Sequence, residues 1–211
     1  MYARVKASQV IEIIPGAKAL TIDGTQYPSS IFSIWTKDAL KAIGIYSYSE
    51  TGMKDTFYYN IGSISYTVDD DAGTVVGTYA STPKDLDDVK WTQSEIDAGL
   101  APTGATTDTV KTQGLKSLWV ERIKTQAKSL IEKYDWYSTR KAQSGAAIPL
   151  AVNTYINAVR TASGVNEANV ASTANVTQMI TRSNATFDGE GKFSANSVYQ
   201  EWPVDPNAPL M

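Results

Sequence analysis

The chain contains 211 residues, with neither cysteine nor histidine. That length fits one large domain or two small ones, and it suffices for a core without disulfide or metal staples. The two missing residue types exclude disulfide bridges, zinc sites built from cysteine and histidine, and the Ser-His-Asp arrangement of hydrolases. The 19 Lys and Arg residues against 22 Asp and Glu give a net charge of −3, which argues against a dedicated nucleic-acid-binding protein.

The first 80 residues have the pattern of β-strands joined by tight turns. Apolar residues alternate at 2–6 and form a short run at 10–14, as strands do. Asp23-Gly24 separates two further short strand-like segments and is a strong signal for a two-residue hairpin turn. These features predict a β-rich module.

One short helix is expected within this module, over residues 37–43. Thr36 is a suitable N-cap, and Gly44 stands where a left-handed C-cap is expected. Further along, alternating segments flank an acidic loop at 69–73, which predicts a second hairpin. A calcium site is the weaker interpretation of this loop, because its twelfth position is Ala80 and not the bidentate glutamate that such a loop requires.

Residues 81–114 change character. Thr92 and Glu95 match a capping box and predict a short helix that ends at Gly99. Residues 101–114 are rich in threonine and lack aromatic side chains, which predicts a linker or a long exposed loop. An acidic cluster precedes the capping box; we interpret it as a solvated surface turn, with a carboxylate pair for glycan cleavage as the alternative (Asp85, Asp87 and Asp88).

From residue 115 the apolar period becomes helical, and residues 115–163 predict two helices that form an αα-hairpin. The first helix extends to about Tyr134, the turn covers 138–147 with Gly145, and the second helix begins at Pro149 and ends near residue 161. Residues 111–141 contain eight basic and three acidic residues. A solvated helix face is the first interpretation of this charge; an acidic protein partner and nucleic acid are the alternatives.

Residues 164–211 predict a segment rich in small residues, with a weak third helix, followed by an extended tail. Proline at 203, 206 and 209 favours a polyproline-like conformation there. The tail and residues 101–114 have little apolar surface to offset the entropy lost on ordering, about 1–2 kcal/mol per residue. We therefore expect both segments to lie against neighbouring subunits or a partner protein, with Trp202 as the anchor.

Together these patterns predict an α+β protein with a β-rich N-terminal module of hairpins, a C-terminal αα-hairpin and an extended tail. The expected divisions are 1–80 for the docking module, 81–114 for the short helix and linker, 115–163 for the αα-hairpin and 164–211 for the remainder. No stretch approaches the about 18 apolar residues of a transmembrane helix, and the basic N-terminus is not followed by a signal-peptide core. No membrane insertion, cofactor or metal is expected.

Two blocks of the sequence resemble a family of bacteriophage tail proteins known as tail fibre or tail fibre assembly proteins. The first block covers 122–162 and contains Asp-Trp, Thr-Arg, Gly, Ile-Pro, Tyr and Val-Arg in that order (Asp135-Trp136, Thr139-Arg140, Gly145, Ile148-Pro149, Tyr155 and Val159-Arg160). The second resembles a module at the start of such proteins (Tyr2-Ala3-Arg4-Val5, Glu12-Ile13-Ile14-Pro15, Tyr27-Pro28, Trp35, Leu40 and Ile43-Gly44-Ile45-Tyr46). The resemblance covers about half of the chain.

The resemblance implies a protein that is made in the host cytoplasm and acts at the phage tail. A structural component of the virion, in or beside the fibre or baseplate, is the first hypothesis. Its expected partners are other tail proteins and further copies of itself, without nucleic acid. A fibre assembly chaperone that is absent from the mature particle and a glycan-binding or glycan-cleaving tail protein are the alternatives. With neither histidine nor cysteine and no phosphate-binding loop, we expect no catalytic activity.

Aromatic and arginine side chains are the candidates for protein–protein contact, because interfaces are enriched in them. The candidate interface residues are Trp119, Tyr134, Trp136, Arg140, Tyr155, Arg160 and Trp202.

Overall fold

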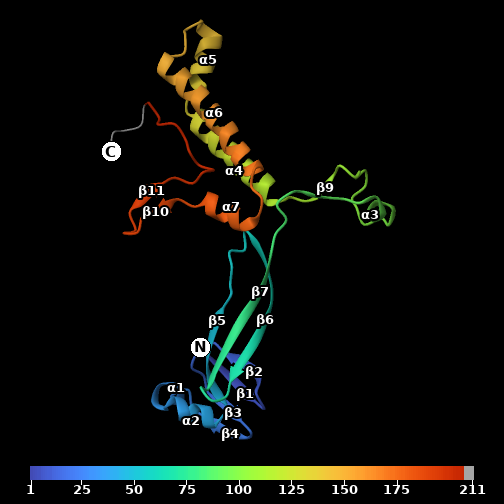
Figure 1. Cartoon of the computed structure of the whole chain (residues 1–211), viewed down its shortest axis with the longest axis vertical. Helices are drawn as coiled ribbons and strands as arrows, with labels where there is room; N and C mark the ends of the chain where they lie inside the picture. Colours follow the sequence, from blue (N-terminus) through green and yellow to red (C-terminus); the bar gives the residue numbers. More distant parts are fainter. Residues whose placement is uncertain (207–211) are drawn as a thin grey trace. The chain divides into compact units, whose positions relative to one another are not determined.

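The computed structural model describes residues 1–206 and contains two compact units, Met1–Pro83 and Lys84–Met211 (Figure 1). Helices and strands both occur, and the α+β fold class predicted from the sequence is confirmed. The first unit ends close to residue 80, where the sequence predicts the end of the β-rich segment.

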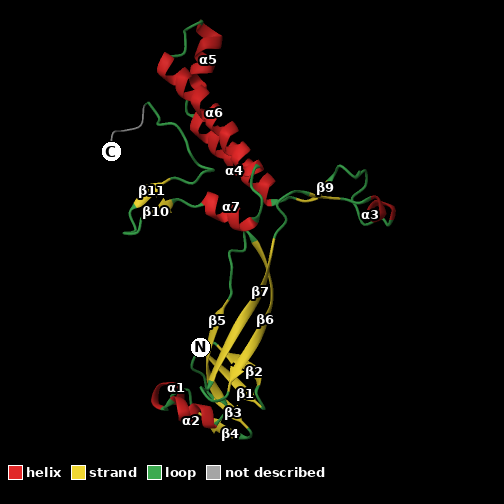
Figure 2. Ribbon diagram, viewed as in Figure 1, coloured by secondary structure: helices red, strands yellow, loops and turns green. Residues whose placement is uncertain are grey.

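The first unit is built on a mixed five-stranded sheet with the strand order β2-β1-β5-β7-β6 (Figure 2). Its neighbouring strands pair antiparallel, except for the parallel pair β5 and β7. Its elements are β1 (Tyr2–Lys6), β2 (Gln9–Ile14), β3 (Leu20–Ile22), β4 (Thr25–Tyr27), α1 (Ile31–Ile34), α2 (Lys37–Ala42), β5 (Ile45–Thr51), β6 (Tyr59–Asp69) and β7 (Thr74–Pro83).

Strand β5 shows how this sheet buries both of its faces. Ile45 belongs to the apolar cluster that includes residues of α1, α2 and the β3–β4 hairpin, while Tyr46 and Tyr48 belong to a second cluster with Val75 of β7. Successive side chains on a strand point to opposite faces, so adjacent residues fall into different clusters. The sheet therefore has a core on each side.

The hairpins and the helix expected in this unit are confirmed. Asp23 and Gly24 both have positive φ angles, 47° and 83°, as the favoured two-residue hairpin turn requires. The Thr36 side chain accepts a hydrogen bond from the Ala39 amide at the start of α2. The acidic loop joins β6 to β7, with the Asp69 carboxylate bonded to the Ala72 amide at 2.8 Å.

The second unit is mainly helical. Its elements are β8 (Val89–Lys90), α3 (Gln93–Asp97), β9 (Val110–Thr112), α4 (Leu115–Glu132), α5 (Asp135–Ser144), α6 (Leu150–Ala171), α7 (Val176–Ser183), β10 (Thr186–Phe187) and β11 (Phe193–Ala195). Helices α4 and α6 pack against each other as the predicted αα-hairpin. The capping box at Thr92 and Glu95 is present at the start of α3.

Two details of the predicted hairpin are wrong. The segment 138–147 is not a simple turn, because α5 occupies Asp135–Ser144 and ends at Gly145 in the left-handed conformation. Helix α6 does not end near residue 161 but continues to Ala171. The helix continues because the row of buried residues on one of its faces continues: Ser163 and Asn166 follow Val159 at helical spacing and are buried. Since both are polar, the sequence pattern does not reveal that this face extends beyond residue 161.

The segment 101–114 is anchored within its own unit, contrary to the expectation that a neighbouring subunit orders it. β9 pairs with β8, the Gly114 amide donates to the Asp88 carboxylate at 2.7 Å, and the Leu115 amide donates to the Asp85 carbonyl at 3.0 Å. A Cβ atom on Gly114 would lie 2.5 Å from the Leu86 carbonyl oxygen, so the chain closes on itself here. Residues 84–114 are a closed loop at the start of α4.

The end of the chain contains no helix or strand from residue 196 to 206, in agreement with the predicted extended tail. Its final part, residues 207–211, lies outside the described residues. The expectation that Trp202 is anchored on a neighbouring subunit differs from the structure, in which its indole packs against the αα-hairpin of its own chain. The apolar face of that hairpin provides the burial that a separate subunit was expected to provide.

Candidate interface at the closed end of the helical hairpin

Most of the predicted interface residues gather where α5 connects α4 to α6. Tyr134 precedes α5, Trp136 and Arg140 belong to it, and Tyr155 lies on α6. Trp202 packs against the same apolar cluster from the C-terminal segment. Together with Tyr137, a neighbour that the sequence did not single out, the residues Tyr134, Trp136, Arg140 and Tyr155 form what we call the α5 cap.

Four aromatic rings of the α5 cap form a continuous ladder. The Trp136 and Tyr137 ring centroids are 3.9 Å apart, and Tyr137 and Tyr134 are 6.3 Å apart. Tyr134 then meets Tyr155 at 5.6 Å with its ring nearly perpendicular. The Tyr137–Tyr134 and Tyr134–Tyr155 separations are those of favourable aromatic pairs. The ladder connects the exposed Trp136 ring to the buried core.

Arg140 lies across the exposed end of this ladder. Its guanidinium carbon is 4.9 Å from the Trp136 ring centroid and 5.1 Å from that of Tyr137. One terminal nitrogen donates to the Ala147 carbonyl at 3.3 Å, which ties α5 to the loop before α6. The Arg140 Nε is buried and has no hydrogen-bond acceptor within residues 1–206.

The buried end of the ladder is held by the C-terminal segment. The Tyr134 hydroxyl donates to the Asp205 carboxylate, which also pairs with the Lys133 ammonium. That ammonium lies 5.3 Å from the Tyr134 ring centroid and 5.8 Å from that of Tyr155. Lys133 therefore balances the charge of Asp205 and stacks on two rings of the cap.

Tyr155 is the most deeply placed ring of the cap, at 4% exposure. Its hydroxyl has no hydrogen-bond partner in the described part of the chain. Burial raises the pKa of Tyr155 above its ordinary value, and the nearby Tyr134 adds to the shift, so the hydroxyl stays protonated at neutral pH.

The exposed end of the cap has the chemistry of a protein-binding surface. Trp136 is 52% exposed although it is a large apolar side chain. Its ring is already fixed by Tyr137 and Arg140, so little side-chain entropy remains to be lost on binding. Tryptophan, tyrosine and arginine are the residues that dominate binding energies at protein interfaces.

The two remaining predicted interface residues lie elsewhere. Trp119 of α4 is buried, and its ring centroid is 5.2 Å from that of Tyr199 in the C-terminal segment. Arg160 is exposed on α6. Trp119 is a core residue, and Arg160 does not belong to the cap.

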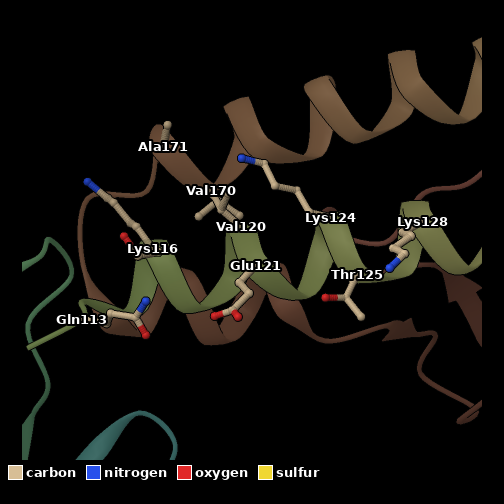
Figure 3. Close-up of a pocket in the computed structure, with 10 residues that line it drawn as sticks. Gln113, Lys116, Val120, Glu121, Lys124, Thr125, Lys128, Val170 and Ala171 are labelled. Atoms are coloured by element: carbon tan, nitrogen blue, oxygen red, sulfur yellow. The ribbon is translucent and has the colours of Figure 1, made fainter.

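A second surface feature of this unit is a groove of about 530 Å³ along α4 (Figure 3). Val120 and Val170 lie close together between the helices, and Lys128 also lines the groove. The other two lysines of the groove are paired within the chain: Lys116 with Asp87 at 3.0 Å and Lys124 with Glu167 at 3.6 Å. This pairing favours a solvated helix face over an anion-binding surface.

The acidic cluster considered for glycan cleavage serves to close the 84–114 loop. Asp87 pairs with Lys116, Asp88 accepts from the Gly114 amide, and the Asp85 carbonyl accepts from the Leu115 amide. Within residues 1–206, no group of three or more carboxylate side chains is arranged to hold a metal ion. None of the helices in this range is long and apolar enough to cross a membrane.

Comparison of the chain with protein-family models, curated proteins and solved structures found no significant match.

Proposed function

We propose that this protein is a structural component of a bacteriophage tail that attaches tail proteins to one another through the α5 cap. The observation that carries the proposal is the half-exposed Trp136, whose ring contacts both Tyr137 and Arg140. The tail assignment comes from the resemblance of 122–162 to tail fibre proteins, and the cap lies within this block.

The construction of the chain supports an attachment role. Each unit has its own apolar core. The carboxylates of Asp87 and Asp88 make structural contacts within the chain. A rigid aromatic surface on a helical hairpin is suited to fixed contacts in a permanent assembly.

Mass spectrometry of purified virions of the phage that encodes the chain tests this proposal. The chain should be present at a fixed ratio to a major tail protein, and it should remain after the particles are banded on a density gradient. Its presence in infected cells together with its absence from banded virions would contradict the proposal and favour an assembly factor instead.

A further inference from the structure

The last described part of the chain, residues 197–205, lies over the helical hairpin as an extended strap. It contains no helix or strand, yet Tyr199 is fully buried and Trp202 packs against the apolar cluster of the hairpin. In Figure 2 this segment leaves β11 as a loop and runs beside the helices. The strap is therefore held by anchor side chains and not by a backbone ladder.

The helices supply nearly all the partners of the strap. Asn169 of α6 donates to the Val198 carbonyl at 3.3 Å, and Asn166 donates to the Glu201 carbonyl at 3.2 Å. The Val198 amide donates to the Arg182 carbonyl of α7 at 2.9 Å. Trp119 stacks on Tyr199, while Lys133 and Tyr134 hold Asp205. The partners of the strap thus lie on α4, α6 and α7 and on the short connections next to these helices.

The connection to the strap is exposed along its whole length. Every residue from 184 to 196 is exposed, including the β10–β11 hairpin. Phe187 and Phe193 are 61% and 54% exposed, with their ring centroids 6.3 Å apart. Thirteen residues can span up to about 45 Å when extended. Once the β10–β11 hairpin opens, this connection can therefore reach another molecule while the helices of both chains stay folded.

We propose that a second copy of this chain exchanges straps with the first, so that each helical hairpin receives residues 197–205 of the other. The exchanged strap makes the same contacts as the resident one, so no contact between the strap and the helices is lost on exchange. The two connections then run side by side, so that the rings of Phe187 and Phe193, which are exposed to water in the monomer, are covered by those of the other chain. The gain from this burial is what favours the exchanged dimer.

The concentration dependence of the exchange follows from the covalent connection between each strap and its own helices. A resident strap competes at an effective concentration on the order of millimolar, so closed monomers should predominate in dilute solution. Exchange should become visible when the chain itself approaches that concentration. The proposal concerns the purified chain alone, so its failure would leave the proposed tail function unaffected.

The Lys133–Asp205 ion pair provides a direct readout, because a carbodiimide joins an amine to a carboxylate in contact with it. Chains with natural isotopes and chains labelled with ¹⁵N are mixed in equal amounts, incubated, cross-linked and digested. Each exchanged pair has an even chance of joining a labelled to an unlabelled peptide. The internal control is the Lys124–Glu167 pair between α4 and α6, which must stay within one chain.

At about millimolar chain concentration, mixed-isotope Lys133–Asp205 peptides should appear in a dimer fraction, while Lys124–Glu167 peptides remain unmixed. At about one hundredth of that concentration the mixed peptides should disappear. The double substitution Phe187→Ser and Phe193→Ser should reduce the mixed fraction and leave the unmixed Lys133–Asp205 peptide intact. Unmixed peptides at both concentrations, or a dimer whose Lys133–Asp205 peptides are all unmixed, would overturn the proposal.

Discussion

Asp205 accepts a hydrogen bond from the hydroxyl of Tyr134, a residue 71 positions earlier in the chain. This bond connects the end of the strap to the aromatic ladder of the α5 cap. Because the same carboxylate pairs with Lys133, a single side chain holds the strap to the junction of α4 and α5. The order of the strap is therefore coupled to the residues that lie beneath the exposed Trp136.

The first prediction concerns this carboxylate. Asp205→Asn retains an acceptor for Tyr134 but removes the charge that faces Lys133, and a charge-assisted hydrogen bond is about twice as strong as a neutral one. We expect the amides of the strap to exchange with solvent about fivefold faster, which corresponds to about 1 kcal/mol in the opening free energy. Hydrogen–deuterium exchange measures this. Glu201→Gln is the matched control, because the exposed Glu201 contacts the helices through its main-chain carbonyl, which accepts a hydrogen bond from Asn166. Equal amide protection of the strap in the two variants would contradict the role of Asp205.

A second prediction concerns the close packing of the sheet at Gly77. A Cβ atom at this position would lie 2.5 Å from the Tyr48 hydroxyl and 2.6 Å from Ile64 Cδ1. Gly77→Ala should therefore overpack the core and lower the unfolding free energy of the first unit by about 1–3 kcal/mol in chemical denaturation. The control is Gly62→Ala, whose Cβ would meet Ala80 at an ordinary 3.4 Å. A Gly77→Ala chain that is no less stable than the control would show that β5, β6 and β7 do not pack as described.

The third prediction concerns Gly164, which lies inside α6 and not at its end. A Cβ atom here would meet nothing within 4 Å, and the residue is exposed. Gly164→Ala should raise the stability of the second unit by about 0.5–1 kcal/mol, because glycine is a poor helix former. The reverse change, Ala168→Gly at another exposed position of α6, should lower it by a similar amount. Thermal unfolding tests both, and a destabilising Gly164→Ala would mean that the helix is interrupted there.

A fourth prediction concerns Glu95 of the capping box. A hydrogen bond from Lys111, followed by hydrogen bonds from the Thr92 amide and hydroxyl, lowers the pKa of Glu95 to about 2. A depressed pKa in the folded state stabilises the charged form. Its contribution to the loop is therefore present above the ordinary glutamate pKa of 4.5 and is lost as the pH falls toward 2.

An NMR titration of the Glu95 side chain measures this pKa. Lys111→Ala should raise it toward the ordinary value, while Lys90→Ala, which removes a partner of Asp108 in the same loop, should leave it unchanged. A Glu95 carboxylate that titrates near 4.5 in the unaltered chain would contradict the contacts described for α3 and β9.

Much of the fold could be predicted because local signals agree with the final structure. The Asp23-Gly24 turn and the Thr92–Glu95 capping box are short-range devices that work over a few residues. The helical period from Leu115 identified the face of α4 that packs on α6, and Trp119 and Ile123 are both buried. In the turn and the capping box the local sequence contains the whole interaction, whereas for α4 it identifies only which face is buried.

Other features depend on contacts that no local pattern contains. The parallel pairing of β5 with β7 brings together strands separated by a long hairpin. The buried Asn166 looks like a surface residue in sequence, because its partner is the Glu201 carbonyl, 35 residues away. The candidate site shows the same division. Trp136, Tyr134 and Tyr155 could be selected by residue type, whereas Tyr137 and the ladder that it completes depend on how α5 packs on the hairpin.

The amount of protein incorporated into tails tests the central claim, attachment through the α5 cap. A phage lacking its own copy is complemented with the unaltered chain, with Trp136→Ala or with Arg140→Ala, and the chain is quantified by mass spectrometry against a major tail protein in purified particles. Arg160→Ala is the matched control, because this exposed arginine lies on α6 outside the cap. Loss of an interface hot spot is typically at least about 2 kcal/mol, so both cap variants should fall at least about tenfold in incorporation while Arg160→Ala stays at the unaltered level. Folded cap variants that enter tails as well as the unaltered chain would contradict the claim.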